Sequence, residues 1–158
     1  MSIFEDDLHY IKENLIDCDL ENSTILITGG GGFLGYYLVN YLYKFSKFHN
    51  IKKIVLLDAF LFDKPNWLKN IENKEILEVF KFVVGKDSFS EFKEKYKFSH
   101  VIHMASIASP TFYRKYPLKT IDANVWGLRD LLESFKSSSF LKSLIFMSSS
   151  EIYGDPEP

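Results

Sequence analysis

Residues 25–35 decide the fold of this chain; they read Ile25-Leu26-Ile27-Thr28-Gly29-Gly30-Gly31-Gly32-Phe33-Leu34-Gly35. A short apolar, β-branched run leads directly into glycines, and a helix-like segment follows. Gly29, Gly32 and Gly35 fit the pattern T-G-x-x-G-x-x-G. Glycine permits a tight turn, a close approach of the backbone to a pyrophosphate, and close packing of helix on strand. The helix N-terminus offers free N–H groups and a partial positive charge. The stretch therefore predicts a loop that binds a dinucleotide.

Strand-like and helix-like segments alternate along the rest of the chain. Apolar periodicity predicts helices at 3–16, about 33–45 and about 118–135, and a short polar helix at 88–97. Strands are expected at about 24–28, 53–58, about 77–84, about 100–105 and 143–148. Residues 59–74 read as loop with some helix, and Pro110 and Pro117 bracket a further loop. The apolar stripe expected on the last long helix consists of Ile121, Val125, Leu128, Leu131 and Leu132.

This alternation predicts an α/β fold with a Rossmann-like, doubly wound parallel sheet. The 53–58 run is too apolar for a strand with one wet face, which favours a parallel sheet covered on both sides. We expect a helical appendage at residues 1–20 and a dinucleotide-binding domain at 21–158.

Composition excludes several classes of protein. The chain has 158 residues, of which 46% are apolar and 25% charged, and its net charge is -2. This charge gives no electrostatic reason to expect nucleic acid or an anionic membrane as a partner. No run approaches the ~20 apolar residues of a membrane span. Cys18 is the single cysteine, so no internal disulfide or cysteine metal cluster can form, and the histidines lack ligand-like spacing. The acidic start lacks the basic region of a signal peptide, so a cytoplasmic location is expected.

Polar and small side chains follow the predicted strands where a cofactor would lie. Asp58 comes 23 residues after Gly35, and an acid near this spacing accepts hydrogen bonds from the adenosine ribose. Its carboxylate would repel a 2′-phosphate, which favours NAD over NADP. Asp87 could accept from the adenine amino group, and small residues after the fourth strand leave room for the cofactor. His103 reads as a core histidine. The residues expected to contact NAD are Gly29, Gly32, Phe33, Leu34, Gly35, Asp58, Ala59, Phe60, Asp87, Ala105 and Ser106.

Hydroxyl and carboxyl groups follow the fifth strand in Ser149-Ser150-Glu151-Ile152-Tyr153-Gly154. Ser149 could hydrogen-bond a sugar hydroxyl that is being oxidised. Glu151 could act as a general acid or base once it is partly buried. These two residues are the candidate catalytic groups, and no metal site is expected.

The chain resembles the N-terminal part of the extended short-chain dehydrogenases/reductases, within the NAD-dependent nucleotide-sugar epimerase/dehydratase group. The glycine loop, Asp58, His103-Met104-Ala105-Ser106, Asn124-Val125-Trp126-Gly127 and 149–154 occur in the family's order and spacing. The resemblance implies oxidation at C4 of a UDP- or dTDP-linked hexose, with Ser149 contacting the C4 oxygen. Glu151 matches an acid used by 4,6-dehydratases and UDP-glucuronate decarboxylases. The resemblance also implies that Tyr113 and Ser150 contact substrate. The segment 105–120 is most similar to the decarboxylases.

The sequence departs from the family in two places. Asp122 and Ala123 stand where the decarboxylases generally carry Lys and Thr, and an acid there disfavours a glucuronate carboxylate. The family's catalytic Tyr-x-x-x-Lys would follow Ser149 by about 25–30 residues, beyond Pro158 (Tyr43-x-x-x-Lys47 reads as coincidence). We therefore expect a sheet incomplete at its C-terminal side, no sugar-binding domain and no turnover by these 158 residues alone.

Three interpretations remain open at this point: a fragment of a longer enzyme, half of a split enzyme, and a non-catalytic NAD-binding module. An open edge after the fifth strand favours self-association, so a homo-oligomer is expected.

Overall fold

A computed structural model of the chain describes residues 2–15, 19–61, 63–72 and 75–155. Cys18 lies outside these ranges. The strands are β1 (Thr24–Thr28), β2 (Lys53–Asp58), β3 (Leu77–Lys81), β4 (His100–His103) and β5 (Ser143–Phe146). They form one sheet in the order β3-β2-β1-β4-β5, and every pairing is parallel. The doubly wound sheet expected from the alternating pattern is confirmed.

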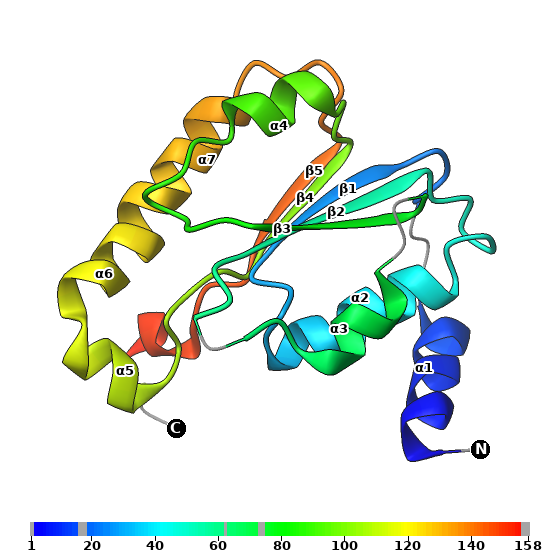
Figure 1. Cartoon of the computed structure of the whole chain (residues 1–158), viewed down its shortest axis with the longest axis horizontal. Coiled ribbons are helices and arrows are strands. Elements are labelled where there is room, and N and C mark those ends of the chain that lie inside the picture. Colours follow the sequence, from blue (N-terminus) through cyan, green and yellow to red (C-terminus); the bar gives the residue numbers. More distant parts are fainter. Residues whose placement is uncertain (1, 16–18, 62, 73–74, 156–158) are drawn as a thin grey trace.

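Helices cover both faces of this sheet (Figure 1). The helices α1 (Ile3–Asn14), α2 (Phe33–Lys44) and α3 (Asn66–Ile71) lie on one side. On the other side lie α4 (Ser90–Lys95) and α7 (Gly127–Phe135), the latter continuous with α6 (Pro117–Ile121). Alternate strand residues serve the two layers: Ile25 and Ile27 join the core beneath α2, whereas Leu26 joins the core beneath α4 and α7. The chain thus buries apolar side chains on both faces, as its central strands required.

The N-terminal appendage is a helix packed on α2. Leu8 is buried, and the Phe4 ring stacks on Tyr36 with ring centroids 4.6 Å apart. The Tyr37 hydroxyl donates a hydrogen bond to Asp7 at 3.2 Å. The helix expected at 3–16 is therefore present as α1, which ends at Asn14.

Three strands end earlier than their apolar runs suggested. β3 ends at Lys81, although Phe82 still donates to the Asp58 carbonyl at 2.8 Å, and a turn with Gly85 at φ +82° follows. β4 likewise ends at His103 and β5 at Phe146. In each case apolar residues continue past the last pair of the ladder; Phe82 and Val84 are buried, whereas Met147 is 46% exposed. The short helix expected at 88–97 covers only Ser90–Lys95.

The interpretation of the proline segment as a loop was wrong. Pro110 begins α5 (Pro110–Lys115) and Pro117 begins α6. Proline is well tolerated in the first helical turn because its missing N–H has no partner there anyway. The prolines therefore start helices here.

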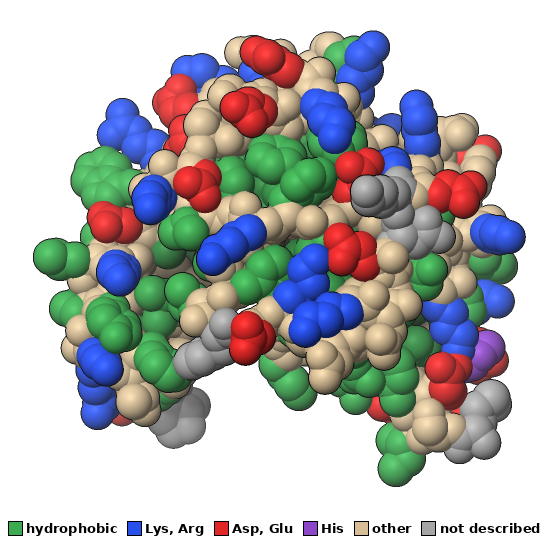
Figure 2. Space-filling view, in the orientation of Figure 1, with side chains coloured by type: hydrophobic (Ala, Val, Ile, Leu, Met, Phe, Trp, Pro, Cys, Tyr) green, Lys and Arg blue, Asp and Glu red, His purple; other side chains and the backbone are tan. Residues whose placement is uncertain are grey.

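The long helix expected at 118–135 is broken by the π-helical segment η1 (Asp122–Trp126), which lies between α6 and α7. Bonds of the i→i+5 type disturb the 3.6-residue register of the apolar stripe. Leu131 is buried, but Ile121 is 50% and Val125 52% exposed, so the predicted stripe does not form one buried face. Figure 2 shows hydrophobic side chains at the surface on the left of the view, over α6 and α7. Among the described helices, none is long and apolar enough to cross a membrane.

Candidate functional site

The candidate site lies at the carboxyl edge of the sheet. Because all strands are parallel, the loops that follow them meet at this one edge. The glycine loop follows β1, Asp58 ends β2, Ala105 lies just after β4, and Ser149 lies beyond β5. The 3₁₀ helix η2 (Ser150–Tyr153) and α5 also lie at this end of the molecule (Figure 1).

The glycine loop can only be built from glycine at two positions. Gly29 adopts φ +72°, and a Cβ there would lie 2.6 Å from the Cα of Ala105. A Cβ on Gly35 would lie 2.0 Å from the carbonyl oxygen of Gly30. The first glycine therefore lets the loop cross the end of β4, and the last lets α2 pack against the loop.

The N-terminus of α2 is open to a ligand. Gly32 is its N-cap, no side chain caps the first turn, and that turn contains no acidic residue. A Cβ on Gly32 would meet only the Gly29 carbonyl oxygen, at 3.5 Å. Phe33 and Leu34 are exposed. This 12-residue helix thus presents its free N–H groups and positive dipole end outward, which is what a pyrophosphate needs.

Asp58 makes hydrogen bonds to the backbone that its position in the sequence did not predict. Its Oδ2 accepts a hydrogen bond from the Gly31 N–H at 2.9 Å, and its Oδ1 accepts from the Phe60 N–H at 2.8 Å. Phe60 has φ +44°, which turns the chain back over the loop. Each carboxylate oxygen has a second acceptor position, so the pair can still receive ribose hydroxyls. Asp58 and Ala59 are half-buried beside the loop.

Asp87 closes the turn after β3. Its Oδ2 accepts from the Val83 N–H at 2.7 Å, and its side chain is exposed. One carboxylate oxygen of Asp87 therefore stabilises the turn, and the exposed side chain leaves the other oxygen able to bind a ligand. Its contact with adenine stays a prediction.

A buried pair, Thr28 and His103, connects β1 with β4 at the same edge. Thr28 Oγ1 and His103 Nδ1 are 2.6 Å apart, and both residues are fully buried. The Ala105 N–H donates to Thr28 Oγ1 at 3.4 Å. Burial lowers the pKa of the His103 imidazole to about 4, so the ring is neutral at pH 7. The histidine is in the core as expected, but within the described part of the chain its Nε2 has no hydrogen-bond partner.

Sequence reasoning missed Thr28 as the partner of this histidine. The two residues are 75 positions apart, and only the β1–β4 register brings them together. The available signal was that each is a polar residue at the end of an apolar strand.

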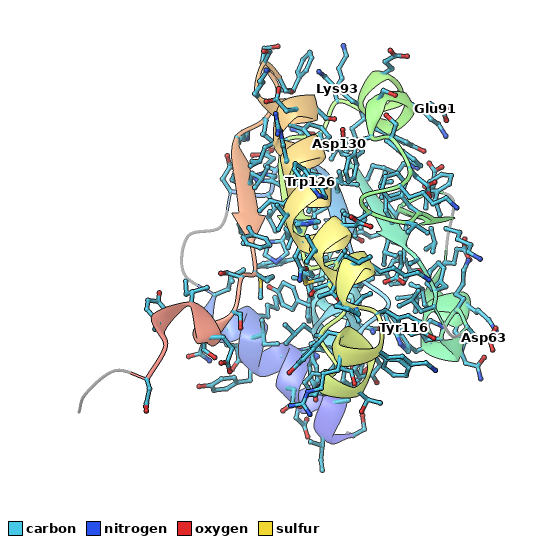
Figure 3. The ribbon with its side chains drawn as sticks, turned by 90° about the vertical axis from the view of Figure 1, so that its left-hand side faces the viewer. Asp63, Glu91, Lys93, Tyr116, Trp126 and Asp130 are labelled. Atoms are coloured by element: carbon cyan, nitrogen blue, oxygen red, sulfur yellow. The ribbon has the colours of Figure 1, made fainter. Side chains whose placement is uncertain are left out.

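The candidate catalytic residues lie on an exposed turn. Ser149 is the N-cap of η2, and its Oγ accepts from the Glu151 N–H at 3.2 Å. Ser150 and Glu151 are both exposed, so the partial burial suggested for Glu151 is not present. Tyr113, on α5, is 37% exposed. Figure 3 shows the neighbouring α6–η1–α7 column end to end, with Trp126 and Asp130 on it. No described group of three or more His, Cys, Asp or Glu side chains could hold a metal.

Known proteins share this sequence pattern. The sequence model of the NAD dependent epimerase/dehydratase family matches residues 25–158. A dTDP-D-glucose 4,6-dehydratase of Dictyostelium discoideum is 39% identical over 145 residues, which is 86% of this chain and 31% of that protein. UDP-glucuronic acid decarboxylase 6 of Arabidopsis thaliana is 33% identical over 135 residues, covering 85% of this chain and 36% of that protein. The chain thus spans about a third of the length of these relatives.

The fold is shared as well. The solved structure of UDP-N-acetylglucosamine 4-epimerase from Methanobrevibacter ruminantium M1, in complex with UDP-N-acetylmuramic acid, matches with a TM-score of 0.68. Its sequence is 25% identical, and the match covers 86% of this chain and 41% of that chain. These findings confirm the expected Rossmann-like fold, and the family description agrees with the expected cofactor.

Proposed function

The chain belongs to the NAD dependent epimerase/dehydratase family, and we propose that it forms the NAD-binding part of an enzyme that modifies a nucleotide sugar. One observation carries the proposal: the uncapped N-terminus of α2, behind a turn that only glycine can make, stands beside the carboxylate of Asp58. This arrangement combines a site for a pyrophosphate with an acceptor for ribose hydroxyls.

The residues present fit the whole dinucleotide. The N–H groups of the first turn of α2, at Phe33 to Gly35, would hold the pyrophosphate. Asp58 would hold the adenosine ribose, next to Ala59 and Phe60, and Asp87 would receive the adenine amino group. Ala105 and Ser106 would leave room for the nicotinamide end after β4. When bound, NAD supplies an acceptor for the hydride that leaves the sugar carbon as its hydroxyl is oxidised.

The groups after β5 would act on the sugar. Ser149 would hydrogen-bond the oxygen at C4 and orient it, with Ser150 and Tyr113 beside the substrate. Glu151 would hold or release a proton at a neighbouring carbon. Because Glu151 is exposed, a bound sugar would have to exclude water from it before its carboxyl could work as an acid near pH 7.

We favour a UDP- or dTDP-linked hexose over a glucuronate as substrate. Asp122, at the start of η1, is an acid where the decarboxylases carry Lys, and a carboxylate there would repel a substrate carboxylate. A 4,6-dehydratase is therefore the first candidate, and Glu151 is consistent with it. Decarboxylation is the second candidate, because the 105–120 segment is most similar to that group.

Two expectations and one alternative accompany this function. The exposed apolar residues of α6 and η1 support self-association of the chain. A polypeptide of residues 1–158 alone lacks the family's Tyr-x-x-x-Lys after Ser149, so we expect it to bind NAD without converting a nucleotide sugar. A purely NAD-binding module is the alternative, and it would bind NAD with no effect of changes at Ser149 or Glu151.

Isothermal titration with NAD and NADP tests the proposal. We expect saturable NAD binding, weaker NADP binding, and a loss of roughly tenfold or more in NAD affinity for Asp58→Asn, because a charge-assisted hydrogen bond to the ribose is weakened. Asp63→Asn is the matched control: it is an exposed acid five positions further on and should leave NAD affinity unchanged. Equal affinity for wild type and Asp58→Asn would remove Asp58 from the site. Absence of NAD binding would overturn the proposal.

A further inference from the structure

A hollow of about 590 Å³ opens at the amino edge of the sheet, opposite the glycine loop. It is lined by residues that stand just before or at the start of four strands, among them Thr24, Lys52, Ser99 and Lys142. These residues lie together because the N-terminal ends of all strands in a parallel sheet are at the same edge. In Figure 1 the α4–β4 and α7–β5 connections lie at the top, far from α5 and η2 at the lower left.

Positive charge dominates the lining of this hollow. Four lysines, Lys52, Lys95, Lys97 and Lys142, face one lining carboxylate, Glu21. The whole chain carries a net charge of -2, so this is a local concentration of charge.

Only two of the four lysines have a carboxylate partner in the described structure. Lys142 pairs with Asp19 at 3.0 Å, and Lys95 lies 3.6 Å from Glu78. Lys97 instead has its ammonium 4.9 Å from the centre of the Phe140 ring, and Lys52 forms no ion pair with any residue that the structure describes. Exposed pairs of this kind contribute about 0–1 kcal/mol, so even the paired lysines could turn to a stronger anion.

Some lining residues of the hollow are held by hydrogen bonds and burial, whereas its lysines have long, flexible side chains. Ser99 Oγ accepts a hydrogen bond from the Thr24 N–H at 3.1 Å, which joins the starts of β1 and β4. Thr24 and Tyr96 are buried, and Phe140 forms part of the wall. The volume lies within the range of small-molecule sites. Lysine ammonium groups on flexible stems bind phosphate as point charges with three donors each.

We propose that this hollow is a second binding site, separate from the NAD site, for a small anion that carries a diphosphate group. The chemistry is shared by inorganic pyrophosphate and by nucleoside diphosphates, and the titrations below separate these sources. The inference is independent of the function proposed above, because none of its residues lies at the carboxyl edge.

The test is an NMR titration of the ¹⁵N-labelled chain with inorganic pyrophosphate, at low ionic strength and without NAD, which itself carries a diphosphate group. We expect saturable shifts of the amides of Thr24, Ser99 and Lys142. Because each residue is observed separately, shifts at Gly31 and Gly32 report the NAD site independently. A failure of NAD binding therefore leaves this test intact.

Charge removal provides the decisive comparison. The double variant Lys52→Gln/Lys97→Gln should weaken pyrophosphate binding roughly tenfold or more, since it removes both unpaired ammonium groups. The control Lys47→Gln/Lys69→Gln removes the same charge from exposed positions outside the hollow and should change the affinity less than about twofold. Non-saturable shifts, or equal weakening by both variants, would overturn the proposal.

A second titration with UDP identifies the source of the diphosphate. Tighter binding of UDP, with added shifts at Phe140, would assign the site to a nucleoside diphosphate. Equal affinity would show that the diphosphate group alone is recognised.

Discussion

Two alanine substitutions in the glycine loop separate folding from cofactor binding. At Gly29 the backbone has φ +72°, where alanine costs about 1–2 kcal/mol. A Cβ would also lie 2.6 Å from both the Cα and the N of Ala105. Those are backbone atoms at the end of β4, so the loop and the strand must move apart, and overpacking of this kind costs about 1–3 kcal/mol. Gly29→Ala should therefore lower the free energy of unfolding by about 2–5 kcal/mol.

Gly32→Ala is the matched substitution three residues away. Gly32 has φ -81°, which alanine adopts readily, and a Cβ there would meet only one atom, at 3.5 Å. The free energy of unfolding should fall by less than about 1 kcal/mol. The new methyl group would, however, stand in front of the free N–H groups of α2. We expect NAD affinity to fall at least tenfold, on the order of 1.4 kcal/mol.

Urea denaturation and isothermal titration with NAD measure the two effects on each variant. We expect the two variants to differ: Gly29→Ala should mainly lower the free energy of unfolding, and Gly32→Ala should mainly lower the affinity for NAD. Equal stability of Gly29→Ala and wild type would refute the close approach of the loop to β4. Unchanged NAD affinity in Gly32→Ala would refute the role of the α2 N-terminus.

Two further predictions concern buried side chains of the core. Burial lowers the pKa of His103 from 6.5 to about 4. Between these two pH values the unfolded chain binds a proton on this ring and the folded chain does not. The shift therefore contributes about 3 kcal/mol to the free energy of unfolding above pH 6.5, and this contribution is lost as the pH falls toward 4. Urea denaturation of His103→Asn should show a shallower pH dependence than wild type in this window, and parallel curves would contradict the assignment. Leu8→Ala should lower the free energy of unfolding by about 2–5 kcal/mol if α1 is integral to the core, whereas Tyr10→Ala, at a 67% exposed position, should change it by less than about 0.5 kcal/mol. Similar effects of the two substitutions would show that α1 does not pack as described.

Local sequence was a good guide wherever one physical requirement decided the structure. The bounds of β1 and β2 agree with the apolar runs, because a strand buried on both faces leaves no room for polar residues. Gly29 and Gly35 were identified from the spacing alone, since no other residue satisfies the backbone there. Asp58 was likewise placed at the end of β2.

Local sequence was a poor guide wherever two readings of the same residue were possible. Proline either interrupts or begins a helix, and Pro110 and Pro117 begin helices because each stands in a first turn, where its missing N–H has no intrahelical partner. The apolar stripe predicted beyond Pro117 required a regular α-helix. The π-helical segment Asp122–Trp126 changes the helical register, so these side chains do not share one face. Gly127 lies where this segment ends, and its position against Val84 depends on packing between distant elements.

The sequence by itself determined the parallel sheet, the glycine loop, the acid beside it and the family, because each rests on residues close together in the chain or on a fixed order of motifs. Only the tertiary structure decided how those parts are held. It showed that Asp58 accepts one hydrogen bond from the Gly31 N–H of the glycine loop, that Thr28 and His103 form a buried pair, and that four lysines distant in sequence line one hollow. These contacts join residues far apart in the chain, and they form only when the parallel strands lie side by side in register.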